Sequence, residues 1–154
     1  MKKIMIIAAF CIFIFALSAQ TGLFDLSYGM DYRTCMDILE ENGFRIFDAN
    51  DNIAEFAALD NLYVESIGLV LDPADDTLAG WYVIYIPQKE ENIEDIVLAA
   101  LVSHHGEDIL YDNESGNAAW VLDGNRHVDA SWDEYGNFYM VVYWDNSKLN
   151  LFTY

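Results

Sequence analysis

Positively charged residues are scarce in this chain of 154 residues, which has 7 Lys and Arg against 26 Asp and Glu and a formal charge of −19. Proteins that bind nucleic acids or anionic membrane surfaces use clustered Lys and Arg to neutralise phosphates. Here the basic residues are scattered, at Arg33, Arg45, Lys89 and Arg126 among others. The composition therefore predicts no nucleic-acid partner and no binding to anionic membranes.

Cysteine is nearly absent as well, since the chain has only Cys11 and Cys35. Cys11 lies inside an apolar run and follows Phe10, where a lipoprotein signal needs a small residue, so lipid attachment is not expected. The apolar run that contains Cys11 is expected to be removed, as argued below. Cys35 is then the single cysteine and cannot close an intramolecular disulfide, so stability must come from a packed core. Cys35 is at helical spacing with Met36 and Leu39, which favours a buried side chain over a nucleophile.

Long apolar runs are limited to one, from Ile4 to Leu17. Lys2 and Lys3 precede it and small residues follow it, which is the pattern of a secretory signal peptide. We expect residues 1–19 to be removed, although cleavage after Ser18 stays open. The run is shorter than the roughly 20 residues that span a bilayer. Cleavage leaves five basic residues against 26 acidic ones, a charge of −21, in a periplasmic or secreted protein without membrane insertion.

Apolar residues are abundant, at 54% hydrophobic and 15% aromatic, which is enough to fold a chain despite its high charge. We expect a single domain over residues 20–154. Segments 31–42 and 92–105 have helical periodicity, with Asp31 and Asn92 as N-caps and Gly43 and Gly106 as stops. After each helix the spacing of apolar residues changes from the helical period of about 3.6 residues to the strand period of two. The predicted strands are 44–48, 53–59, 62–71, 79–86, 108–112, 117–122, 126–132, 137–144 and 149–154.

The two halves match each other in order. The matching segments are 47–48 with 111–112, 64–65 with 128–129, and 81–84 (Trp-Tyr-Val-Ile) with 138–141 (Phe-Tyr-Met-Val). We therefore predict an α+β fold of two helix-plus-meander repeats, about 26–89 and 90–147, that form one sheet with both helices on one face.

Short motifs resemble known families of secreted proteins. Residues 26–31 (Leu-Ser-Tyr-Gly-Met-Asp), which lead into a helix, resemble the entry segment of BamE-like periplasmic proteins. Trp120, the turn at 123–124, residues 128–129 and the turn at 133–136 are similar to hairpins of PepSY-like proteins. Both families are related in architecture to the β-lactamase inhibitory protein, a tandem of helical and four-stranded repeats. The resemblance implies a noncatalytic, protein-binding role and transfers no binding residue.

Motifs for catalysis are missing. The sequence has no Gly-x-Ser-x-Gly elbow and no Gly-rich phosphate loop, so we expect no enzyme and no cofactor. The imidazoles are His104, His105 and His127. Adjacent helical residues point about 100° apart, so no metal site is expected from them.

Acidic turns are the main alternative to this interpretation. Segment 48–52 starts like an EF-hand loop, but Ile53 replaces the required Gly and Leu59 replaces the Glu. Segments 72–76 and 112–114 offer further carboxylates. Turn chemistry explains all three segments, and a calcium- or glycan-binding cell-surface protein stays as the alternative function.

Aromatic and apolar residues occupy both faces of two predicted strands. In strand 79–86 the faces are Trp81, Val83, Tyr85 and Tyr82, Ile84, Ile86; in strand 137–144 they are Phe138, Met140, Val142, Trp144 and Tyr139, Val141, Tyr143. A sheet with helices on one side needs only one apolar face. The second apolar face therefore predicts a surface that contacts a partner. The alternatives are that a loop, residues 21–27 or a second copy of the chain in a homodimer covers this face.

We expect Tyr82 and Tyr139 on the open side, with Trp81, Phe138 and Met140 packed under the helices. The charge of −21 favours a basic protein as the partner. The predicted function is an exported, noncatalytic, protein-binding or inhibitor-like module. Its candidate binding residues are Tyr82, Tyr139, Tyr143, Trp120 and Trp132.

Overall fold

A computed structural model describes residues 21–89 and 91–152 of the chain. The expected signal peptide at 1–19 lies outside the described residues. Over the described part, every helix is too short or too polar to span a lipid bilayer.

Over the described residues the fold is α+β, as predicted, and consists of one antiparallel sheet with two α-helices and two 3-10 segments. The helices are α2 (Tyr32–Glu41) and α3 (Ile93–His105), and the 3-10 segments are η1 (Leu23–Asp25) and η2 (Asn146–Leu151). The strands are β1 (Phe44–Ala49), β2 (Ile53–Ala58), β3 (Val64–Asp72), β4 (Thr77–Tyr85), β5 (Leu110–Asp112), β6 (Asn117–Val121), β7 (Arg126–Trp132) and β8 (Tyr139–Asp145).

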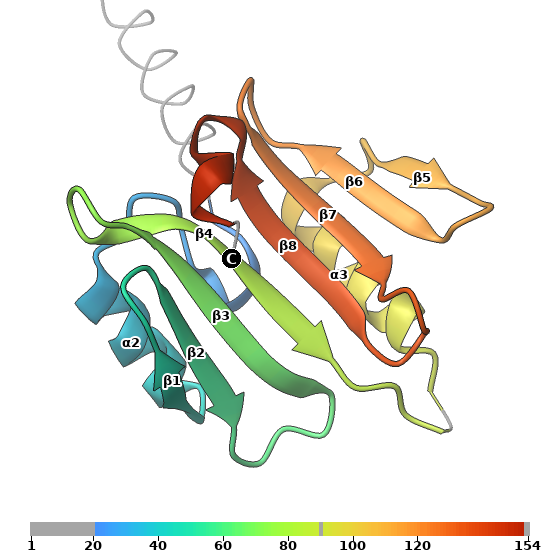
Figure 1. Cartoon of the computed structure of the whole chain (residues 1–154). Helices are drawn as coiled ribbons and strands as arrows, with labels where there is room; N and C mark the ends of the chain where they lie inside the picture. The colour runs from blue at the N-terminus through green and yellow to red at the C-terminus, as the bar shows by residue number, and fades with distance from the viewer. Residues whose placement is uncertain (1–20, 90, 153–154) are drawn as a thin grey trace, which may run out of the picture.

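The strand order is β1-β2-β3-β4-β8-β7-β6-β5. Each α-helix precedes four consecutive strands, and the two groups of strands meet where β4 pairs with β8, at the middle of the sheet (Figure 1). The predicted helix ends are confirmed. The Asp31 carboxylate accepts a hydrogen bond from Thr34 N at 3.0 Å, and the Asn92 side chain accepts one from Glu94 N at 3.2 Å.

Eight of the nine predicted strands are present, and their ends differ from the prediction by no more than two residues. The ninth prediction, a strand at 149–154, is wrong, because η2 occupies Asn146–Leu151. Asp145 explains the change of direction, since its carboxylate caps η2 by accepting a hydrogen bond from Ser147 N at 2.8 Å. The chain therefore leaves the sheet plane at the end of β8.

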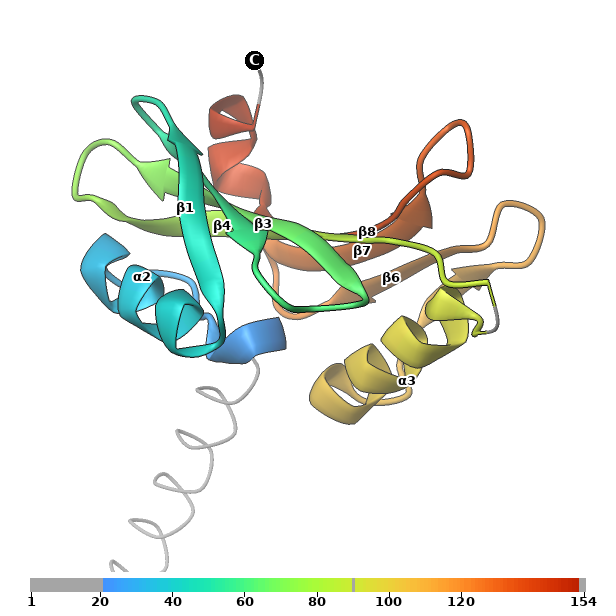
Figure 2. The same ribbon diagram turned by 90° about the horizontal axis from the view of Figure 1, so that it is seen from below.

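The elements are arranged in layers. In Figure 2, α2 and α3 lie below the sheet with η1 between them, whereas η2 lies above the sheet. Below the sheet, Cys35 and Leu39 of α2 and Val97 and Leu101 of α3 are buried, with exposed fractions of 0 to 2%. The segment before η1 packs closely on the sheet. A Cβ atom on Gly22 would lie only 2.3 Å from Cε1 of Tyr143.

The pairing of β4 with β8 shows that the expected division of the two faces is wrong in part. Residues that face each other in an antiparallel pair share a face, and Tyr85 faces Tyr139 while Trp81 faces Tyr143. All four are buried on the helix side, with exposed fractions of 0 to 7%. Trp81 is under the helices and Tyr82 is on the other face, as expected.

Tyr139 was expected on the open face but is buried, while Phe138 and Met140 were expected under the helices but are on the other side. Phe138 is 38% exposed. The physical reason is that side chains alternate between the two faces of a strand. The sequence comparison of the two halves matched Trp81 with Phe138, and this match is one residue out of register. A shift of one residue moves a side chain to the opposite face of the sheet.

The burial predicted for Cys35 is confirmed, because its side chain is fully buried and burial raises the pKa of the thiol to about 12. Ellman's reagent should therefore react with native mature protein at least about a hundred times more slowly than with the unfolded chain, since only the thiolate reacts. The Cys35→Ser variant is the blank. Rapid labelling of the native protein would contradict this packing.

Removing the Tyr139 side chain should destabilise the fold strongly. We expect Tyr139→Ala to lower the free energy of unfolding by roughly 3–5 kcal/mol through cavity formation, and Phe138→Ala to lower it much less. Tyr139→Phe should cost nothing, because the hydroxyl is buried without a hydrogen-bond partner among the described residues. Urea unfolding measures all three variants. A larger loss for Phe138→Ala than for Tyr139→Ala would reverse the assignment of the faces.

Candidate functional site

The face of the sheet opposite α2 and α3 is here called the open face; of the described helices, only η2 lies on it (Figure 2). Its central strands present partly exposed apolar and aromatic side chains, which are Tyr82, Ile84, Met140, Val142 and Trp144. Solvent-exposed apolar patches of this kind mark interaction sites. The open face is therefore the strongest candidate site on the described part of the chain.

One row of residues crosses the open face from β2 to β5. Strand register places these residues side by side: Glu55, Gly68, Tyr82, Val142, Asp129, Ala119 and Leu110. The centre of the row is apolar and aromatic. A carboxylate lies on each side of this centre, Glu55 on β2 and Asp129 on β7.

Tyr82 lies flat across the neighbouring strand β3. A Cβ atom on Gly68 would lie 2.0 Å from Cζ of Tyr82, so a side chain on Gly68 would displace the ring. The ring spans β3, and its hydroxyl donates a hydrogen bond to Oε1 of Glu55 on β2. Gly68 and Glu55 together hold Tyr82 in one orientation.

Trp144 is held in a similar way on the other side of the centre. Its indole Nε1 donates a hydrogen bond to Asp129. Its ring stacks on His127, with ring centroids 4.5 Å apart and planes 18° apart. Each carboxylate of the row is therefore bound to an aromatic donor, which orients the carboxylate.

Neither carboxylate of the row has a cationic partner among the described residues. The salt bridges in this part of the chain join Arg126 to Asp123 and Asp145, and Lys148 to Asp72. The open face consequently combines an apolar centre with two carboxylates that are in no salt bridge with a described residue.

A groove of about 390 Å³ runs along the open face between Tyr82 and Phe152. Phe152 follows η2 and lies against β4, where a Cβ atom on Gly80 would be 2.4 Å from Cζ of Phe152. Apolar side chains make up most of the lining, and Glu55 is its acidic group; the apolar residues include Ile53, Val70, Ile84, Met140 and Val142.

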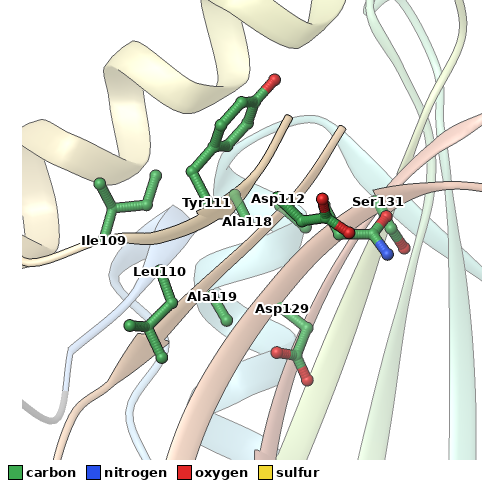
Figure 3. A pocket seen from close by; sticks show the side chains of 10 residues that line it. Ile109, Leu110, Tyr111, Asp112, Ala118, Ala119, Asp129 and Ser131 are labelled. Atoms are coloured by element: carbon green, nitrogen blue, oxygen red, sulfur yellow. The ribbon is translucent and has the colours of Figure 1, made fainter. Parts of the chain in front are cut away.

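A second hollow, of about 560 Å³, lies along β5, β6 and β7 (Figure 3). It forms where Ala118 and Ala119 leave space on β6. In Figure 3, Leu110 and Asp129 point to one side of these strands, whereas Tyr111 points to the other side, toward α3. Asp129 therefore lines this hollow as well as belonging to the row.

Of the five candidate binding residues, only Tyr82 lies on the open face. Tyr139, Tyr143 and Trp120 are buried under the helices, with exposed fractions of 0 to 2%, so a partner cannot reach them in this fold. Trp132 is partly buried and donates a hydrogen bond from Nε1 to Glu94 of α3 at 2.9 Å. These four aromatic residues belong to the core or pack against it. The sequence did not separate them from Tyr82, because aromatic content alone does not distinguish the two faces of a strand.

Sequence reasoning missed Glu55 and Asp129 as members of the site. Each is a single acidic residue within a strand pattern, and only the pairing of strands brings them into one row. The one local signal was Gly68, because a glycine inside a strand often marks a close approach by another group.

The acidic turns bind their own backbone. Asp123 Oδ1 accepts hydrogen bonds from Asn125 N and Arg126 N at 2.9 Å each, and Asp112 accepts one from Glu114 N at 3.0 Å. These backbone bonds to Asp123, and a Ser115 hydroxyl bond to Asp112, hold the pKa of each carboxyl below its usual value. The described residues contain no group of three or more His, Cys, Asp or Glu side chains that could hold a metal ion.

His105 and His127 lie in different surroundings. His105 packs under the sheet, where Nε2 is 2.9 Å from the hydroxyl of Tyr143. Burial, with a smaller contribution from the charge of His104, lowers the pKa of His105 to about 4. His127 instead lies beside Trp144.

His105 should make the stability of the protein depend on pH. An unfolded histidine takes up a proton near pH 6.5 and native His105 only near pH 4, so stability is lost as the pH falls through this range. His105→Gln should remove this part of the slope in urea-unfolding free energies, while the neighbouring His104→Gln should retain it. Equal slopes in both variants and the wild type would contradict the burial of an uncharged imidazole.

Comparisons of the chain with protein-family models, with curated proteins and with solved structures find no match. The resemblance to BamE-like and PepSY-like proteins therefore stays a prediction from short motifs. The geometry of the open face is therefore the basis for a functional proposal.

Proposed function

We propose that this chain is an exported, noncatalytic module that binds a partner protein through the open face of its sheet, in the manner of an inhibitor. The observation that carries the proposal is the row from Glu55 to Leu110, whose apolar and aromatic centre lies on the side of the sheet away from α2 and α3 (Figure 2) and is flanked by carboxylates. Protein interfaces commonly combine an apolar and aromatic core with a polar rim.

The partner surface is basic. The open face carries Glu55 and Asp129 without cationic partners among the described residues, and the chain has a formal charge of −19 before any processing. Charge of this size accelerates association with a cationic surface and makes the rate sensitive to salt.

The sheet is built from two repeats of a helix and four strands. The strand order is symmetrical about the β4–β8 pair, and an α-helix precedes each set of four strands. This symmetry supports the repeat proposal. The last strands of the two repeats, β4 and β8, then form the centre of the binding face.

Photo-crosslinking tests the proposed function. The crosslinking amino acid p-benzoylphenylalanine replaces Met140 on the open face or, as a control, Asp37 on the exposed surface of α2. We expect the Met140 position to capture one protein from an extract of the exported fraction and the Asp37 position to capture none. High salt should suppress the capture. Equal capture at both positions, or none at Met140, would overturn the proposal.

A further inference from the structure

The groove between Tyr82 and Phe152 is shaped by two glycines. Gly68 lets the Tyr82 ring lie flat on β3, and Gly80 lets the Phe152 ring lie against β4. Both rings line the groove, and so does Val70, which is 1% exposed. The groove is apolar along its length and has Glu55 as its acidic group.

The charge of the groove selects its occupant. Glu55 is in no salt bridge among the described residues, so a purely apolar occupant would desolvate the carboxylate without compensation. An aliphatic chain that ends in a positive charge satisfies both parts of the groove, because such chains pack their methylene groups on apolar surface and extend the charged end to a polar group.

The hydrogen bond from Tyr82 distinguishes lysine from arginine. The Tyr82 hydroxyl takes one lone pair of Oε1 of Glu55, so a donor that uses both oxygens of this carboxylate has to share Oε1 with Tyr82. An arginine guanidinium binds a carboxylate best through both oxygens, whereas a lysine ammonium acts as a point charge and needs one. The remaining oxygen of Glu55 therefore suits lysine.

We infer that the groove receives a lysine side chain of the partner, with its methylene groups between Tyr82 and Phe152 and its ammonium group on Glu55. This inference rests on the proposed function, since it names the part of the partner that the open face recognises. It makes Glu55 a residue that determines specificity, and Phe152 the wall that excludes water from the lysine stem.

The test uses n-butylammonium, which has the stem and charge of a lysine side chain, in a nuclear magnetic resonance titration of the mature protein. We expect saturable shifts at millimolar concentrations for the groove residues Val70, Tyr82 and Val142. Ammonium chloride and 1-butanol, which supply charge or stem alone, should give no saturable shifts there. n-Butylguanidinium should bind more weakly than n-butylammonium.

Two variants locate the site. Glu55→Gln keeps an acceptor for the Tyr82 hydroxyl and removes the charge, so it should weaken n-butylammonium binding about threefold, the size of a partly exposed ion pair. Phe152→Ala should weaken it as well by opening one wall. Glu107→Gln, an exposed carboxylate elsewhere, is the matched control and should change nothing.

The outcomes separate this inference from the proposed function. Shifts confined to other acidic surfaces, no saturation, or equal binding by wild type and Glu55→Gln would overturn the lysine groove even if Met140 captures a partner. Failure of capture at Met140 would instead remove the protein-binding function, whatever the groove binds. Tighter binding of n-butylguanidinium would overturn the assignment to lysine.

Discussion

The pairing of β4 with β8 is the contact on which the rest of the structure depends. It joins the two four-stranded halves of the sheet and sets Trp81 opposite Tyr143. The two rings stack with centroids 4.1 Å apart and planes 8° apart. Because side chains alternate along each strand, this one register decides which aromatic residues support the core and which remain on the open face.

Tyr143 links three parts of the chain below the sheet. Its hydroxyl accepts a hydrogen bond from Leu23 N at 3.1 Å and lies 2.9 Å from Nε2 of His105. Gly22 packs against the same ring. The segment before α2 therefore fills the space between the two helices, and the helix side of the sheet forms a continuous core. The open face is left free of this role in stability.

Small residues and aromatic donors organise the open face. Gly68 and Gly80 let two rings lie against the sheet, which produces a groove in place of a flat surface. Tyr82 and Trp144 donate hydrogen bonds to Glu55 and Asp129, so both carboxylates are oriented before any partner arrives. A site arranged in advance loses less conformational entropy on binding.

Local sequence determined most of the secondary structure. The helices begin after Asp31 and Asn92 and stop before Gly43 and Gly106, as the capping and turn preferences of these residues predict. These preferences act through only a few adjacent residues. The hydrophobic period likewise separates helices from strands. The α+β class and the burial of Cys35 follow from the same patterns.

Only the tertiary structure decided the faces of the central strands and the composition of the site. Tyr139 and Phe138 are adjacent aromatic residues, and nothing in their own chemistry says which is buried; the hydrogen-bonded register with β4 does. Glu55 and Asp129 join one row because four strand pairings align them across the sheet. Strand register is a property of contacts between distant segments, so it is absent from the local patterns that determined the elements themselves.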